Sequence, residues 1–254
     1  MPDKWNPELY ERFESERSRP FYDLVDMVHR QENLRVLDLG CGTGKLTKYL
    51  HDTLAAQETL GIDASDKMLQ KARQFEGNGL RFEQGKIEEN AGDGKFDVIF
   101  SNAALQWLTE HEALFEKLRG KLQPGGQLAV QIPTMNNEPV HKIAVETAKE
   151  FSQELGGYVR RLEVLSPETY AKLLYKLGFV KQEVKLQIYG HVLPSREAVV
   201  EWYRGTLLTA YESQLNAQTY ERFVERYQQK LFELLEDERP FFFPYKRILM
   251  WGRI

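Results

Sequence analysis

The residues most suited to chemistry gather in one short segment, Asp38-Leu39-Gly40-Cys41-Gly42-Thr43-Gly44, which belongs to an otherwise apolar stretch. Glycine at positions 40, 42 and 44 lets the backbone turn tightly and lets a ligand approach it without a Cβ in the way. The helix expected to follow offers free backbone N–H groups to a carboxylate or phosphate. Asp38 stands among apolar residues, where an unpaired charge is costly, so we expect it to meet a ligand ammonium group directly or through water.

The spacing of these glycines distinguishes two kinds of nucleotide site. A nicotinamide-dinucleotide fingerprint reads G-x-G-x-x-G and would need glycine at position 45, where this chain has Lys45. The chain reads G-x-G-x-G instead. Asp63 ends the next strand-like stretch, where its carboxylate is placed to accept both hydroxyls of a ribose. A nicotinamide-dependent dehydrogenase is therefore the most distant alternative.

A sheet is needed to position these residues, and the pattern between about residues 34 and 131 predicts one. The strand-like stretches, which alternate with helical ones, lie at 35–39, 59–62, 80–84, 96–100 and 127–131. This alternation predicts parallel strands joined by right-handed crossovers and covered by helices on both faces. The fold class is α/β, a doubly wound sheet, in which ligands bind beyond the carboxyl ends of the strands.

After residue 132 the alternation loosens. Ser166-Pro167-Glu168 is typical of a helix start and Gly178 of its end. Strand-like residues follow at 180–189 and again at 246–254, with long amphipathic helices between them. We predict a single domain over 1–254, and the expected cap elements are about 1–30, 134–161 and 194–240.

The composition narrows the possible partners and location. The chain has 254 residues, of which 28% are charged, a formal net charge of −4 and one cysteine, Cys41. There is no basic tract, so nucleic acid is not an expected partner, because neutralising phosphates supplies most of that affinity. No apolar run near Met1 is long enough for a signal peptide or a membrane span. We expect a cytoplasmic protein with no membrane partner, as a monomer or weak dimer.

Together these segments resemble the class I S-adenosylmethionine-dependent methyltransferases. Val36–Gly44 is similar to their first motif, Gly61–Asp63 to their ribose-binding acidic segment, and Phe96–Ala104 to their fourth-strand motif. The resemblance covers roughly residues 34–132. It implies a mostly parallel, seven-stranded, Rossmann-like sheet with a helical cap, and S-adenosylmethionine as the cofactor.

The resemblance also implies which residues bind the cofactor. They are Asp38, Gly40, Cys41, Gly42, Gly44, Asp63, Ala64, Lys86, Ile87 and Asn102. Many members place an aspartate at the position of Lys86 to hold the adenine amino group. Here backbone groups near Lys86, with Ile87 packing on the ring, are predicted to serve instead.

A narrower similarity, over most of residues 1–140, is to the trans-aconitate 2-methyltransferases. It rests on the segments Trp5–Tyr10, Glu16–Pro20, Ser101–Leu108 and Leu128–Pro133. It implies methylation of a small organic acid on a carboxylate, and the candidate substrate-binding residues are Trp5, Tyr10, Arg17, Arg19, Trp107, Trp202 and Arg204. Members carry an arginine near position 209, where this chain has Thr209, which predicts an acceptor preference different from trans-aconitate.

The predicted reaction asks little of the side chains. A carboxylate is ionised at neutral pH and needs no general base, so alignment and exclusion of water would dominate. Arginines are the best holders of a carboxylate, because their planar fork matches its two oxygens. Trp107, after the fourth strand, is predicted to line the methyl-transfer site.

Alternatives remain on the sequence alone. The acceptor could instead be a hydroxyl, an amine or a carrier-bound malonyl group, and for a hydroxyl His191 is the candidate general base. A more distant alternative is a nonenzymatic module that only binds the donor. The five histidines lack metal-ligand spacing, so no metal is expected.

Overall fold

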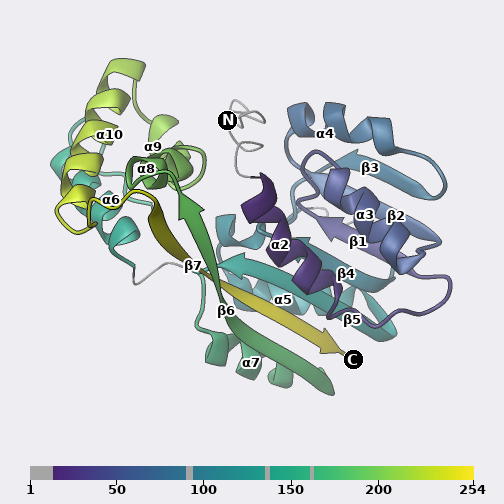
Figure 1. Ribbon diagram of the computed structural model, residues 1–254. Helices are drawn as coiled ribbons and strands as arrows, with labels where there is room; N and C mark the ends of the chain where they lie inside the picture. The colour runs from purple at the N-terminus through teal and green to yellow at the C-terminus, as the bar shows by residue number, and fades with distance from the viewer. Residues whose placement is uncertain (1–13, 90–93, 135–137, 161–162) are drawn as a thin grey trace.

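A computed structural model describes residues 14–89, 94–134, 138–160 and 163–254, and within them seven strands form one sheet in the order β3-β2-β1-β4-β5-β7-β6 (Figure 1). The strands are β1 (Arg35–Leu39), β2 (Glu58–Asp63), β3 (Leu80–Gln84), β4 (Phe96–Asn102), β5 (Leu122–Pro133), β6 (Lys181–Leu193) and β7 (Phe241–Arg253). The first five are parallel, and β7 runs antiparallel to both β5 and β6. Strand order reverses between β1 and β4, which creates a ligand crevice at their carboxyl ends.

The doubly wound α/β prediction is confirmed, since every strand-like stretch noted in the sequence overlaps a strand. The predicted start of the last strand was wrong by five residues. The sequence pattern placed it at Lys246, whereas β7 begins at Phe241, because its pairing with β6 continues as far as Leu193 opposite Phe241. Pro244 is tolerated there because β5 pairs only with residues from Arg247 onward, so the other side of β7 has no strand partner at position 244.

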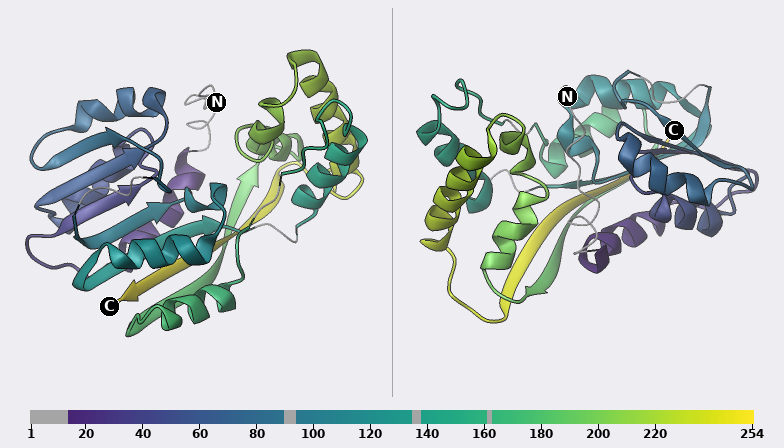
Figure 2. Two further views of the ribbon diagram at one scale, coloured as in Figure 1. Left: turned by 180° about the vertical axis from the view of Figure 1, so that it is seen from behind. Right: turned by 90° about the horizontal axis from the view of Figure 1, so that it is seen from above.

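Helices cover both faces of the sheet. The described helices are α2 (Glu14–Val25), α3 (Lys45–Leu54), α4 (Asp66–Ala72), α5 (His111–Gly120), α6 (Pro139–Glu150), α7 (Pro167–Lys176), α8 (Glu197–Arg204), α9 (Thr209–Glu212) and α10 (Ala217–Phe232), with 3-10 turns η1 (Arg73–Phe75) and η2 (Leu105–Trp107). α2 and α3 pack on one face, and α5 and α7 on the other (Figures 1 and 2). Within the described residues, no helix is long and apolar enough to cross a membrane.

N-caps explain where two helices start, one of which is the start predicted at Ser166. The Ser65 hydroxyl accepts the Met68 N–H at 3.2 Å, and the Ser166 hydroxyl accepts the Thr169 N–H at 3.2 Å. Each cap satisfies a backbone donor that the first helical turn leaves without a partner. The first of these helices, α4, follows Asp63 directly and therefore fixes the backbone just beyond the carboxyl end of β2.

A second apolar core lies away from the sheet. It is formed by α6, α8, α9 and α10 together with the ends of β6 and β7 that meet near Leu193 and Phe241. The long antiparallel pair of strands β6 and β7 runs from the sheet into this group, which we call the cap (Figure 2). The described part of residues 1–30 lies elsewhere: Phe21, Leu24 and Val25 of α2 pack on the sheet.

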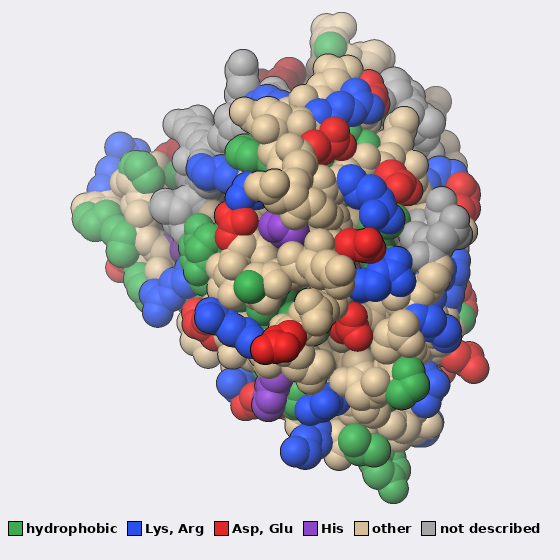
Figure 3. All heavy atoms as spheres, turned by 90° about the vertical axis from the view of Figure 1, so that its right-hand side faces the viewer, with side chains coloured by type: hydrophobic (Ala, Val, Ile, Leu, Met, Phe, Trp, Pro, Cys, Tyr) green, Lys and Arg blue, Asp and Glu red, His purple; other side chains and the backbone are tan. Residues whose placement is uncertain are grey.

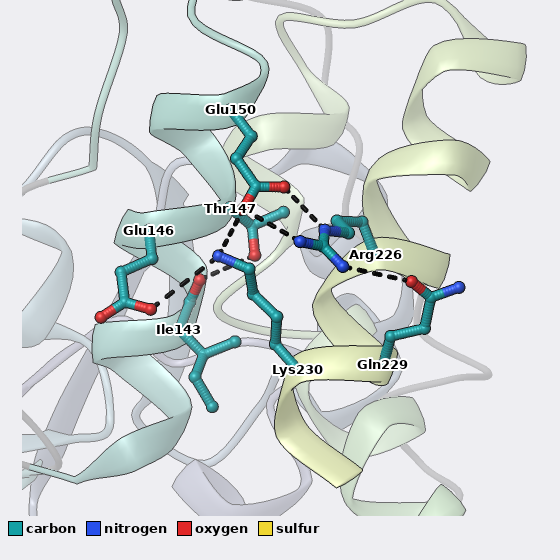
Figure 4. Close-up of polar contacts among 7 residues, drawn as sticks. All are labelled: Ile143, Glu146, Thr147, Glu150, Arg226, Gln229 and Lys230. Atoms are coloured by element: carbon teal, nitrogen blue, oxygen red, sulfur yellow. Dashed lines mark hydrogen bonds and ion pairs between the residues drawn. The ribbon is translucent and has the colours of Figure 1, made fainter. Parts of the chain in front are cut away.

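Ion pairs hold two cap helices together on their outer side (Figure 4). Glu150 of α6 accepts hydrogen bonds from Arg226 of α10, at 2.7 and 3.3 Å, and lies 2.6 Å from the Lys230 ammonium. These two cations lower the pKa of Glu150 to about 2. These ion pairs join α6 and α10 on their solvent-exposed side, whereas the Phe151–Phe223 contact joins the same region in the buried interior.

Charges on the opposite side of the molecule are also balanced locally. The side that carries α3, α4 and β3 shows acidic and basic side chains interspersed (Figure 3). Neighbouring pairs such as Lys48 with Asp52, and Arg81 with Glu83, account for part of this pattern.

Candidate active site

The glycine segment forms the turn between β1 and α3, and two of its glycines serve different needs. Gly40 has φ +79°, and a Cβ there would lie 2.3 Å from the Ala104 Cβ, so this position must be glycine for the turn to pack against the end of β4. Gly42 has φ +55°, and a Cβ there would meet no atom within 4 Å among the described residues. The space above Gly42 is therefore open on the side where a side chain would lie.

Asp63, at the carboxyl end of β2, is tied to this turn. One carboxylate oxygen accepts the Gly42 N–H at 2.9 Å, and the other accepts the Ser65 N–H at 2.9 Å. A carboxylate offers about four acceptor positions, so these contacts are compatible with the predicted hydrogen bonds from ribose hydroxyls. Asp63 is half-buried and lies beside the open space at Gly42.

Asp38, on β1, is a buried carboxylate with an unusual titration. It is 3% exposed and accepts a hydrogen bond from the Thr47 hydroxyl of α3 at 2.6 Å. Burial raises the pKa of Asp38 to about 7, because the charged form loses its hydration, and the nearby Asp63 charge adds to the effect. The Thr47 hydrogen bond offsets part of that rise. A ligand cation at this point would restore the ionised form.

Two amide oxygens near the carboxyl end of β4 have no hydrogen-bond partner among the described residues. They are the buried Oδ1 of Asn102 and Oε1 of Gln106. The Gln106 side-chain N–H₂ is used, since it donates to the Ala103 carbonyl at 2.6 Å. A buried acceptor without a partner is costly, so these oxygens suit a cationic or N–H-bearing ligand.

The predicted adenine side is less enclosed. The Lys86 ammonium points away to Glu89, at 2.6 Å, and both side chains are exposed. Ile87 is 9% exposed and packs in the core beneath, and the Ala64 carbonyl accepts the Gln84 side-chain N–H at 3.2 Å. The Lys86 side chain is thus occupied, which leaves backbone groups as the available contacts there.

Trp107 lies where the sheet meets the cap, in η2 just after β4. The Arg160 guanidinium, from the segment between α6 and α7, lies over its ring with Cζ 4.2 Å from the ring centroid. Arg160 Nη1 also donates to the Leu207 carbonyl of the cap at 3.0 Å. Thr209 begins α9 two residues after Leu207, so the Arg160 guanidinium contacts the chain close to the position where the resemblance predicts an arginine.

The other predicted acceptor residues are not brought to one place. Trp202 is 1% exposed within the cap core, and His191 is 5% exposed and stacks on Trp202 at 5.2 Å between ring centroids. Arg204 forms an ion pair with Glu221 of α10, and Arg19 is exposed on α2. Trp5 and Tyr10 lie outside the described residues, as does the side chain of Arg17.

Sequence reasoning missed Arg160 and Gln106. No local pattern marks either residue, because the contact between Arg160 and Trp107 joins segments far apart in the chain. Gln106 stands in the segment Ser101–Leu108, on which the narrower similarity rests, and its position next to Trp107 was the available signal. That the Gln106 side-chain oxygen is a buried acceptor without a partner among the described residues could not be predicted, because its burial depends on the folded chain.

Comparison with known proteins agrees with this geometry. A family model described as a methyltransferase domain matches residues 30–178. The chain belongs to the class I S-adenosylmethionine-dependent methyltransferases.

Its similarity to particular relatives extends beyond that domain. It is 40% identical over 251 residues to a trans-aconitate 2-methyltransferase of Deinococcus radiodurans, covering 96% of each chain, and 36% identical over 232 residues to one of Acidovorax ebreus, covering 90% and 89%. Among solved structures, the YcgJ protein of Bacillus subtilis superimposes with a TM-score of 0.61 at 17% identity, covering 92% of this chain and 97% of that one. The structural similarity supports the fold.

The residues present fit the cofactor. The open space at Gly42, the buried Asp38 carboxylate and the unpartnered Asn102 oxygen lie at the ends of adjacent strands β1 and β4. Asp38 and Asn102 offer acceptor oxygens to an ammonium group, and Asp63 offers a carboxylate to hydroxyl groups. S-adenosylmethionine carries both an ammonium group and ribose hydroxyls, and when bound it supplies a methyl group on a positively charged sulfur.

Proposed function

We propose that this protein methylates a carboxylate of a small organic acid held between the carboxyl edge of the sheet and the cap. The observation that carries the proposal is the similarity to relatives named trans-aconitate 2-methyltransferase over 96% of the chain, which includes the cap. In this fold the sheet edge serves the donor, so the cap is the part that can hold and select an acceptor. Similarity confined to the sheet would support only the identity of the methyl donor and not that of the acceptor.

The proposed chemistry needs positioning more than proton transfer. An acceptor carboxylate oxygen forms the new bond to the methyl carbon, the carbon–sulfur bond breaks toward sulfur, and the products are a methyl ester and S-adenosylhomocysteine. The acceptor is already ionised at neutral pH, well above ordinary carboxyl pKa values. Trp107 and Gln106 at the end of β4 would line this point and exclude water.

Donor binding in this proposal uses the turn and the strand ends. Asp38 and Asn102 would meet the ammonium, Asp63 the ribose, and Gly40, Cys41, Gly42 and Gly44 the approach of the methionine part. Ala64, Ile87 and the backbone at Lys86 would border the adenine. Of these, Asp38, Asp63 and Gly42 are supported by burial, hydrogen bonding and open space.

The acceptor assignments are supported unequally. Trp107 is well placed, whereas the charge of Arg204 is already balanced by Glu221 and Trp202 is buried in the cap core. Arg19 stays a candidate from α2, together with Arg17, Trp5 and Tyr10. His191, enclosed by Trp202 and Tyr245, would serve as a base only for a hydroxyl acceptor.

We also propose a single domain over 1–254, in which the cap is an extension of the sheet and not an independent unit. The uninterrupted pairing of β6 with β7, from Lys181–Arg253 to Leu193–Phe241, supports this, because the same two strands take part in both cores. The assignment of about 134–161 and 194–240 to the cap is supported by α6, α8, α9 and α10. Residues 1–30 remain a proposed cap element only for the part before α2.

The test is product analysis with S-adenosylmethionine and a panel of small mono-, di- and tricarboxylic acids. With S-adenosylmethionine saturating at every pH, a methyl ester found by mass spectrometry, formed at a rate nearly flat above about pH 6, is the expected result. A rate that rises near neutrality would favour a histidine base and a hydroxyl or amine acceptor. Donor binding without turnover of any acceptor would favour a nonenzymatic module, and only ether or N-methyl products would refute carboxyl methylation. The Thr209 substitution predicts a best acid other than trans-aconitate.

A further inference from the structure

Arg160 differs from most of the arginines that the structure describes in the cap region, and Arg222, which also has no ion pair among the described residues, is exposed on α10 over the Phe151 ring. Arg196, Arg204, Arg226 and Arg239 each form an ion pair with an aspartate or glutamate. Within the described part of the chain, no acidic side chain pairs with Arg160, and the groups that act on its charge are tyrosines. Among the described residues, the half-buried Arg160 charge at the junction of sheet and cap therefore has no acidic counter-charge.

The guanidinium is held in a defined orientation. It lies over the Trp107 ring at 4.2 Å, within the range of a favourable cation–π contact, and Nη1 donates to the Leu207 carbonyl. The Arg160 backbone N–H donates to the Tyr211 hydroxyl at 3.4 Å. A guanidinium has five N–H donors, and only one is used by the described residues, which leaves the fork available for a ligand.

Burial makes this arrangement costly without an anion. Arg160 is partly buried, and burial lowers the pKa of its guanidinium, although an arginine remains protonated at neutral pH. A half-buried cation without a counter-charge is unfavourable, and a carboxylate accepting two charge-assisted hydrogen bonds would relieve that cost. The contact with Trp107, just after β4, places the cation beside the proposed methyl-transfer point.

We propose that Arg160 binds a carboxylate of the acceptor that is not itself methylated, and so sets the specificity of the enzyme. A carboxylate whose oxygens both accept hydrogen bonds from a guanidinium is a poorer nucleophile, because the cation draws electron density from those oxygens. The reacting carboxylate is then a second one on the same molecule, turned toward the donor. This inference rests on the proposed function. It requires an acceptor with at least two carboxylates and a product that keeps one of them free.

The test compares wild-type enzyme with Arg160→Gln and Arg160→Lys, using trans-aconitate, a dicarboxylic acid and its monoamide as acceptors. For wild type, kcat/KM is expected to fall about 100-fold from the diacid to the monoamide. Arg160→Gln should raise KM for both polyacids about 10- to 100-fold with kcat changed less than about threefold, and should remove the preference for the diacid over the monoamide. Arg160→Lys should restore part of the affinity, as a cation without the planar fork.

Arg226→Gln is the matched control, because it also removes a cap arginine but one paired with Glu150 on the outer side. The Arg226→Gln variant should have wild-type kcat and KM for all three acceptors. If Arg160 only braces Trp107 against the cap, Arg160→Gln will lower kcat by the same factor for every acid and leave the diacid preference intact. Either that pattern or an unchanged KM for the polyacids would overturn the inference.

A binding readout separates this inference from the proposed function. In the presence of S-adenosylhomocysteine, polyacids should raise the melting temperature of wild type and not of Arg160→Gln, whose own affinity for S-adenosylhomocysteine should be unchanged. Binding of polyacids through Arg160 without methyl ester formation would refute carboxyl methylation and keep the anion site. Methyl ester formation that does not depend on Arg160 would refute the site and keep the function.

Discussion

Replacing Asp38 with asparagine is expected to stabilise the empty protein at pH 8 and to weaken donor binding. Asp38 is a fully buried carboxyl whose described side-chain partner is the Thr47 hydroxyl. Asparagine has nearly the same shape, and its carbonyl oxygen can accept the same hydrogen bond without carrying a charge. We therefore expect the charge to serve ligand binding and not the stability of the fold.

The size of the effect follows from the pKa. Burial raises the pKa of Asp38 from 3.8 to about 7, which at about 1.4 kcal/mol per unit is on the order of 4 kcal/mol. Because the folded-state pKa is the higher one, the folded protein binds more protons, and this group's contribution to stability is lost as pH rises from about 4 to 7. Asp38→Asn removes that loss, so its free energy of unfolding should exceed that of wild type by about 2–4 kcal/mol at pH 8 and by less at pH 5.

Donor binding should respond in the opposite direction. An ammonium attracts the ionised carboxylate, so Asp38→Asn should lose about 1.5–3 kcal/mol of affinity, the worth of a charge-assisted hydrogen bond. In wild type about one Asp38 in ten is ionised at pH 6 and about half at pH 7. The association constant for S-adenosylhomocysteine should therefore rise about fivefold between these two values, and this rise should be absent in Asp38→Asn.

The assays are urea unfolding of the empty protein and calorimetric titration with S-adenosylhomocysteine, each from pH 5 to pH 8. Asp52→Asn is the matched control, because Asp52 is an exposed aspartate on α3 paired with Lys48. It should change neither quantity appreciably. An Asp38→Asn protein that unfolds with wild-type stability and binds the ligand with wild-type affinity would refute the reasoning.

Four further substitutions test other parts of the structure. Gly42→Val should abolish binding of S-adenosylhomocysteine in calorimetry, because the side chain enters open space, and should lower stability only by the strain of a β-branched residue at φ +55°. Gly40→Val adds to such strain a contact of 2.3 Å with the Ala104 Cβ, so it should unfold at a markedly lower urea concentration than Gly42→Val. Asp63→Ala should weaken the same binding by about 1–3 kcal/mol, and an unchanged affinity in a folded variant would contradict the ribose assignment. Glu150→Gln should lower the free energy of unfolding by about 0.5–1 kcal/mol at pH 7, because its ion pairs are partly exposed. Since the pKa of Glu150 is lowered from 4.5 to about 2, that difference should shrink as pH falls from about 4.5 toward 2, and equal stabilities at pH 7 would count against the role of these pairs.

The sequence by itself determined the sheet and the donor side of the site. The turn from Asp38 to Gly44 needs only local information, since glycine spacing and the flanking apolar strand define both its backbone and its place at a strand end. The Ser65 and Ser166 caps are local in the same way. Parallel strands that are buried on both faces consist of nearly continuous apolar residues, so the sequence alone indicates where these strands lie.

Only the tertiary structure decided the acceptor side. Which arginine lacks a counter-charge depends on partners far away in sequence: Arg204 meets Glu221 from α10, whereas Arg160 meets Trp107 and the Leu207 carbonyl. The early start of β7 likewise depends on its pairing with β6, because Pro244 is permitted only where β5 is absent. Side-chain charge is a property of the sequence, but its compensation depends on which surfaces the folded chain brings together, and no local pattern records that.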